Sequence, residues 1–319
     1  MHHAMKHIAS KILLVFAPMV AQASFLGDLA ANPNVVSSSP YATGGDVILK
    51  LGEAEYVHVF TNTAAAATFT PTENLTAWVL VVGGGGGGNA SNKIFPGGAG
   101  GGGFVEEKGV ELAVGDHAVT VGAGGKGIKA NSGYQDGGAS SFAVSAQETV
   151  VAYGGGASTQ AAGRDGASPS GGAYASGTSY GPGSPVHGVQ GCEGYKGHSM
   201  GGGGGGGAGG AAKAPYGTSK EDSKRYGSAG GDGRASGILG FVQHFGGGGG
   251  GASSNNTDYR TNPGGAGGGG KGGAAAQADT SNAYGGENGL GGGAGGVFQI
   301  SNSAKLARAA TASWQSATP

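Results

Sequence analysis

The chain has 319 residues, of which 77 are glycine, about a quarter of the sequence where an ordinary globular protein has roughly 7%. Charged residues make up 12% and the net charge is −1, which excludes the basic excess expected of a nucleic-acid-binding protein. Aromatic residues make up only 7%, so an apolar core cannot extend over the whole chain; apolar residues are concentrated between Asp46 and Tyr153.

The first 23 residues have the features of a secretory signal peptide. Lys6 and Lys11 precede the apolar residues 12–20, and Ala21-Gln22-Ala23 matches an A-x-A cleavage site. This apolar run of nine residues falls short of the ~20 that a spanning helix needs. We therefore expect cleavage near Ala23 and a secreted, extracellular or cell-surface protein, with a periplasmic location also open. No later segment is predicted to span a membrane.

Cys192 is the only cysteine, so an intrachain disulfide is excluded. We expect a buried free thiol, with pairing between two chains as the alternative.

After a polar segment at residues 24–45, short apolar runs separated by Gly, Asn and Asp predict β-strands. These runs cover residues 47–51, 56–61, 68–70, 75–82, 104–112, 118–121, 140–144 and 149–153. Their short spacing favours an antiparallel sandwich or meander over an α/β fold. No helical pattern precedes Ser303, and the Ala-rich tail 301–319 is expected to be a short helix or a frayed end. The predicted fold is all-β, with few or no α-helices outside the leader and the tail.

Two stretches of the glycine-rich region 83–300 share one plan, in which a pure glycine run leads to a polar loop ending in proline and then to the string GGAGGGG. The loops end at Pro96 and Pro263, and further runs cover residues 201–207 and 291–293. The glycines that bound or begin these runs are Gly83, Gly88, Gly97, Gly103, Gly201, Gly246, Gly251, Gly264 and Gly270.

Left-handed extended helices of the polyproline-II type explain such runs. These helices have three residues per turn, rise about 3.1 Å per residue and make no internal hydrogen bonds, so six or seven residues span roughly 20 Å. Their N–H and C=O groups can bond to neighbouring helices on all sides only if no Cβ keeps the backbones apart. The alternative is flexible linkers, but the fixed plan and the absence of interleaved serine favour an ordered polyglycine-II bundle. Collagen is excluded because a strict Gly-X-Y period is absent.

The sequence strings WVLVVGG at 78–84, GGGGF at 100–104 and VTVGAGG at 119–125 resemble the glycine-rich domain of bacterial and phage surface proteins. The strings DGGASSF at 136–142 and YGGG at 153–156 fit the same pattern. The resemblance implies a small β-sandwich-like part, with strands at 46–82, joined to a polyglycine-II bundle, as in tail-fibre adhesins whose bundle-end loops contact host receptors. The leader and the Ala-rich tail depart from that family's pattern.

Two G-x-S-x-G matches centre on Ser179 and Ser199, but a nucleophile elbow needs a strand before it and a helix after it, which the flanking glycines do not provide. The spacing of His187, Cys192 and His198 matches no zinc pattern. The Asp-Gly pairs at 136, 165 and 232 are interpreted as turns rather than calcium loops. We therefore predict no enzyme activity, no cofactor and no metal site.

Recognition is expected in the loops between glycine runs, because aromatic and charged residues on rigid supports are typical of binding sites. The candidate binding residues are Asn89, Lys93, Ile94 and Phe95 in one loop and Asn255, Asp258, Tyr259 and Arg260 in another. The preferred hypothesis is an adhesive or structural surface protein whose partner is a receptor, a glycan or another copy of the chain. An ice- or polysaccharide-binding bundle face and an esterase acting through Ser199 are the alternatives, and simple solvated caps would also explain the loops.

Overall fold

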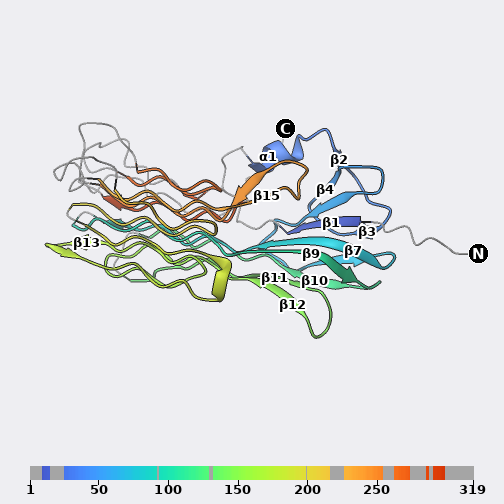
Figure 1. Cartoon of the computed structure of the whole chain (residues 1–319), viewed down its shortest axis with the longest axis horizontal. Coiled ribbons are helices and arrows are strands. Elements are labelled where there is room, and N and C mark those ends of the chain that lie inside the picture. Colours follow the sequence, from blue (N-terminus) through green and yellow to red (C-terminus); the bar gives the residue numbers. More distant parts are fainter. Residues whose placement is uncertain are drawn as a thin grey trace, which may run out of the picture.

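The computed structural model describes residues 9–14, 25–91, 93–128, 132–198, 200–215, 226–253, 262–273, 285–286 and 290–298. Strands gather at one end of an elongated molecule, and extended glycine-rich segments form the other end (Figure 1). The tail 301–319, with its expected helix, lies outside the described residues. The described helices include none long and apolar enough to cross a membrane.

Two sheets form the strand-rich end, which we call the sandwich. The first contains, in spatial order, β2 (Val35–Val36), β4 (Val47–Lys50), β5 (Tyr56–Val59), β1 (Ala9–Leu14), β7 (Leu75–Val82) and β9 (Phe104–Leu112). The second contains β12 (Thr149–Ala152), β11 (Ser140–Ala143), β10 (His117–Thr120), β6 (Ala67–Pro71) and β3 (Ala42–Thr43). Every predicted strand is present with bounds within two residues, which confirms the all-β prediction.

One segment of the first sheet comes from the predicted signal peptide. β1 lies between β5 and β7 and is parallel to both, whereas the other pairs in the two sheets are antiparallel. The structure is that of the uncleaved chain, so the signal peptide remains a prediction. The polar segment 24–45 also contributes α1 (Phe25–Ala30), whose Leu29 is buried against the core.

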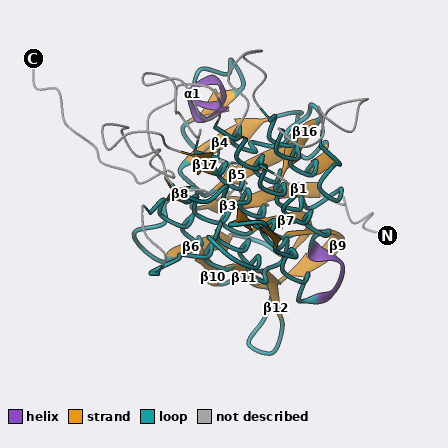
Figure 2. Cartoon of the chain, turned by 90° about the vertical axis from the view of Figure 1, so that its left-hand side faces the viewer, coloured by secondary structure: helices purple, strands orange, loops and turns teal. Residues whose placement is uncertain are grey.

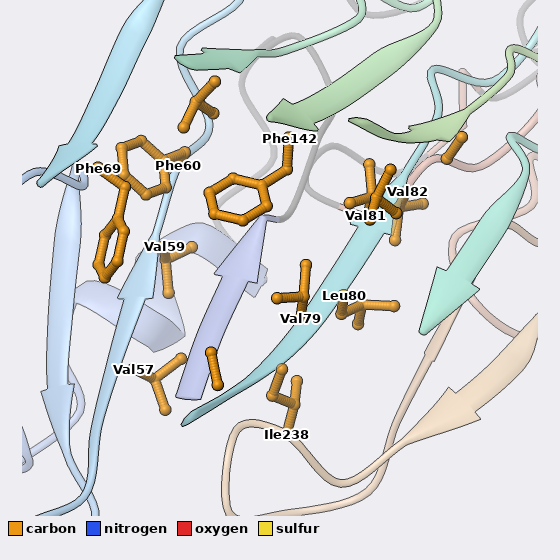
Figure 3. Packing of buried hydrophobic residues seen from close by; sticks show 14 of the residues in the cluster. Val57, Val59, Phe60, Phe69, Val79, Leu80, Val81, Val82, Phe142 and Ile238 are labelled. Carbon is orange, nitrogen blue, oxygen red and sulfur yellow. The ribbon is translucent and has the colours of Figure 1, made fainter. Parts of the chain in front are cut away.

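The sandwich core is a conventional apolar one. Phe69 of β6 and Phe142 of β11 meet edge to face at 6.4 Å between ring centroids, and both are fully buried. They pack with buried valines of β5 and β7 (Figure 3). Alternating burial along β10 and β11 shows why these strands could be recognised from sequence, since one face of each points into the core.

Sandwich strands continue directly into glycine runs. β7 ends at Val82 and leads into 83–88, run 97–103 leads into β9, and β16 (Gln243–Phe245), which pairs with β15 (Arg234–Ser236), leads into 246–251. Seen from the far end, the glycine-rich segments lie side by side in front of the strands (Figure 2). The sheets therefore fix where the runs start.

Run 97–103 shows the hydrogen-bond period of a polyglycine-II helix. Its N–H groups donate in turn to three segments, and every third residue donates to the same one, at 2.8–3.0 Å. Residues 98 and 101 donate to the carbonyls of residues 203 and 206. Residues 99 and 102 donate to those of 294 and 291, and residues 100 and 103 to those of 156 and 153. Its carbonyls accept from Gly83, Gly86, Gly171 and Gly249, which belong to three other segments. A three-residue period with hydrogen bonds to several neighbouring segments matches the predicted polyglycine-II bundle.

Glycine is required in these runs by lateral packing and not by backbone angles. No glycine of runs 97–103 or 201–207 has a left-handed φ. A Cβ added at Gly205 would lie 2.0 Å from the carbonyl oxygen of Ala99, and one at Gly98 would lie 2.0 Å from that of Gly249. Real Cβ atoms do not approach an oxygen so closely, so a side chain at either of these two positions would force the helices apart.

The interpretation of the three Asp-Gly pairs as turns is wrong, because the structure has no turn at any of the three. The carboxylates of Asp136, Asp165 and Asp232 accept backbone N–H groups of Ala157, Ser184 and Ala266 at 2.7–3.0 Å. Laterally directed N–H groups at the edge of the bundle need acceptors, and aspartate supplies them. Burial alone would raise the pKa of Asp232, but hydrogen bonds from Lys213 and Ala266 outweigh it and lower that pKa.

Candidate binding surface

The end of the bundle away from the sandwich, which we call the distal end, is built by the connections between glycine runs. It includes loop 89–96, the hairpin of β13 (Tyr174–Ala175) and β14 (Thr178–Ser179), and the pair of β8 (Ala90–Ser91) with β17 (Val297–Phe298). β13 lies at the tip of the molecule in Figure 1.

Loop 89–96 is bonded through a serine side chain and to a neighbouring segment. The Ser91 hydroxyl oxygen accepts the N–H groups of Lys93 and Ile94, each at 3.2 Å. Phe95 and Tyr174 exchange two backbone hydrogen bonds of 2.9 and 3.0 Å. These bonds restrain residues 93–95, of which Lys93 has an exposed side chain and Ile94 and Phe95 have half-buried ones.

Asn89, predicted as a binding residue, faces the interior. It is 1% exposed, and its side-chain oxygen accepts a hydrogen bond of 3.1 Å from the Gln160 amide. The residue joins two connections of the bundle and offers little surface to a partner.

Three aromatic rings meet beside this loop. Phe95 stacks on Phe298 with 4.3 Å between ring centroids and 20° between planes, and Phe95 and Tyr174 are 6.2 Å apart. All three side chains are half-buried, so one side of the cluster faces solvent. Only Phe95 was predicted from sequence. The Ser-Gly turn after Tyr174 is a hairpin signal that would have placed a second aromatic residue at a tip.

The hairpin that carries Tyr174 projects from the cluster. Its turn residues Ser176 and Gly177 have φ of 47° and 85°, the left-handed pair that two-residue hairpin turns prefer. Thr178 and Ser179 are exposed on the returning strand.

The second predicted loop starts and ends at the same surface. The N–H of Ala252 donates to the Pro96 carbonyl oxygen at 3.0 Å, and the Asn262 amide donates to the Gly251 carbonyl oxygen at 2.6 Å. The bundle thus brings the bases of the two loops together, although they are far apart in sequence. The predicted residues Asn255, Asp258, Tyr259 and Arg260 lie outside the described residues.

Of the glycines named from the sequence as scaffold residues, all except the half-buried Gly264 are buried. At the edge, the guanidinium of Arg164 makes a bidentate ion pair with the Asp136 carboxylate, and this hydrogen bonding raises the pKa of Arg164.

The described residues contain no arrangement of side chains that matches a nucleophile elbow or a metal site. Ser179 lies in an exposed hairpin strand and not in a nucleophile elbow, while Ser199 is outside the described residues. His187 stacks on Tyr153 at the sandwich end, whereas His198 pairs with Gly201 at the distal end, so the two cannot share a metal ion. No group of three His, Cys, Asp or Glu residues in the described part could hold one.

Cys192 is half-exposed, not buried as predicted. The N–H groups of Cys192 and Tyr195 bond to run 201–207. The carbonyl oxygen of Tyr195 accepts the N–H of Gly172, so the segment has bonded neighbours on two sides.

Comparison with known proteins identifies the family. The family model described as a glycine-rich domain matches residues 61–308. The chain belongs to the glycine-rich domain family. The match covers most of the sandwich and the whole described bundle. No curated protein and no solved structure matches the chain.

Proposed function

We propose that this glycine-rich domain protein is a secreted or cell-surface protein with an adhesive or structural role, whose bundle presents the distal end to a partner. The observation that carries this proposal is the half-buried cluster of Phe95, Tyr174 and Phe298, with the exposed Lys93 in the same loop as Phe95. Aromatic rings next to a cation on rigid loops are typical of recognition surfaces.

The bundle suits this role because it holds the loops without using side chains. Loop 89–96 lies between runs 83–88 and 97–103, and the second loop lies between runs 246–251 and 264–270. Each of these runs is hydrogen-bonded to neighbouring segments. Loop residues are thus free to vary while their bases stay fixed, and little ordering entropy remains to be lost on binding. The role we propose is therefore non-enzymatic, and it needs neither a cofactor nor a metal ion.

Binding of the mature protein to an array of immobilised glycans and to bacterial cells tests the proposal. Phe95→Ala and Tyr174→Ala should each weaken attachment at least about tenfold, because hot-spot aromatic residues contribute about 2 kcal/mol or more. Phe241→Ala is the matched control: Phe241 is 43% exposed in the turn between β15 and β16, at the sandwich. Attachment that falls equally in the control, or is unchanged in both distal variants, would remove the distal end from the proposal.

The mass of the exported protein tests the predicted cleavage of the signal peptide. The intact mass of protein recovered outside the cell should correspond to a chain beginning at Ser24. A mass that includes residues 1–23 would contradict leader cleavage.

A further inference from the structure

β1 fills a slot between β5 and β7. Lys11, Ile12 and Leu13 lie opposite Val57, His58 and Val59 of β5, and residues 9–14 lie opposite residues 76–81 of β7. In the described residues β5 and β7 do not pair with each other, and their outer edges are taken by β4 and β9. Two strand spacings, roughly 10 Å, separate their backbones.

Cleavage near Ala23, on which this inference and the proposed function both rest, removes β1 with the leader. β5 and β7 are then left with unpaired N–H and C=O groups that face each other across the slot. An N–H or C=O group that stays buried without a partner destabilises the folded state.

The two strands are not free to close the slot by moving together. β7 pairs with β9 along its whole length and continues into glycine run 83–88, whose N–H groups bond to residues 103 and 100. β5 is held by β4 and by four buried side chains. A replacement strand satisfies these backbone groups without moving either neighbour.

The surroundings specify the chemistry of that strand. Val57 and Val59 of β5 and Val79 of β7 are 0% exposed, and Figure 3 shows them on either side of the strand between them. Phe142 of the second sheet and Ile238 of the β15–β16 turn belong to the same core. Because both faces of the sheet are covered, the occupant must be apolar on both faces, as β1 is at residues 12–14.

Residues 24–319 hold no spare segment of this kind. Their runs of four or more consecutive apolar residues are the four alanines 64–67 and the segments 77–82 and 150–153, and the last two already belong to β7 and β12. Within these residues, a second copy therefore offers no unpaired segment rich in Val, Ile or Leu. We infer that the slot between β5 and β7 is a strand-acceptor site that takes up a parallel, apolar strand from a different protein and so attaches the molecule to that protein.

Uptake of a synthetic peptide by the mature protein tests the inference. The probe is a fluorescent peptide of residues 8–16 with a solubilising tail, and its matched control carries Leu13→Pro, which removes one N–H donor and obstructs pairing. The unchanged peptide should bind saturably and slow amide exchange in β5 and β7. The proline peptide should bind at least about tenfold more weakly, because a lost strand position costs more than 1.4 kcal/mol.

Four results would overturn the inference. Equal binding of both peptides would exclude strand pairing. Protection without peptide of those β5 and β7 amides that face the slot, and not β4 or β9, would show that the slot closes. Assembly of the mature protein into oligomers that exclude the peptide would assign the slot to a second copy. Exported protein that retains residues 9–14 would place the strand in the same chain. Attachment through the distal end is measured separately, so failure of peptide uptake leaves that proposal standing.

Discussion

The sandwich and the bundle reach dense packing by opposite means. In the sandwich, side chains such as Phe69 and Phe142 fill the space between two sheets and keep the backbones apart. In the bundle, backbones touch each other directly, and an added Cβ at Gly205 would lie 2.0 Å from an oxygen. The apolar core is thus sensitive to the loss of carbon atoms, and the bundle is sensitive to their addition.

The energetic balance of the two regions also differs. A hydrogen bond contributes about 0.5–1.5 kcal/mol net, whereas ordering a residue's backbone costs about 1–2 kcal/mol and glycine loses the most freedom. Hydrogen bonds alone therefore do not hold the bundle. The sandwich strands that continue into the runs at Val82 and Phe245 supply fixed starting points and lower this cost.

The largest effect is expected from adding one carbon to the bundle. Gly205→Ala should lower the free energy of unfolding by about 3 kcal/mol or more, at the severe end of overpacking, because the neighbouring helices cannot move apart separately. Gly181→Ala is the matched control, since a Cβ there meets nothing within 4 Å, and it should change stability by less than about 0.5 kcal/mol. Denaturant titration measures both, and a tolerated Gly205→Ala would contradict lateral packing.

Removal of two carbons from the sandwich should cost less. Val79→Ala, at a fully buried position, is expected to lower the free energy of unfolding by about 2 kcal/mol, from about 0.8 kcal/mol per buried CH2 and a residual cavity. The same titration gives the value. A loss larger than that of Gly205→Ala would reverse the proposed order of the two regions.

The pH dependence of the sandwich should follow His58. Burial lowers the pKa of this imidazole, against the raising effect of its hydrogen bond of 2.7 Å with the Gly44 carbonyl oxygen. The unfolded chain then takes up a proton where the folded chain does not, so stability is full above the ordinary pKa of 6.5 and falls as the pH drops below it. His58→Asn keeps a donor for Gly44 and should show a shallower decrease of Tm between pH 7 and pH 5. An unchanged slope would exclude His58 as the cause.

The smallest effect is expected at the edge of the bundle. Asp136→Asn removes the ion pair with Arg164 but keeps an oxygen for the Ala157 N–H. Both side chains are more than a third exposed, so the loss should not exceed about 1 kcal/mol and should shrink in 1 M salt. A salt-independent loss of several kcal/mol would mean that edge contacts, and not central glycines, hold the bundle.

Local patterns explain how far the sequence predicted this fold. Leu75–Val82 and Phe104–Leu112 were predicted with their observed bounds, and the glycine runs that adjoin Val82 and Phe104 mark one end of each strand sharply. The pairing between distant segments could not be predicted from the sequence, since glycine runs are alike and nothing in Gly98 or Gly203 marks them as partners. For the same reason Phe95 was found as a loop aromatic residue, while its contacts with Tyr174 and Phe298 were not. Asn89 was misjudged because a polar residue beside a glycine run can equally bond inward.

Amide hydrogen exchange of the glycine runs in the native mature protein tests the central claim most directly. N–H groups of residues 98–103 and 247–251 donate to neighbouring segments at 2.8–3.0 Å, so their exchange should be slowed to the same degree as that of β11, which pairs with β10 and β12 in the second sheet. Exchange at the rate of an unfolded chain in these runs, with β11 still protected, would contradict the bundle.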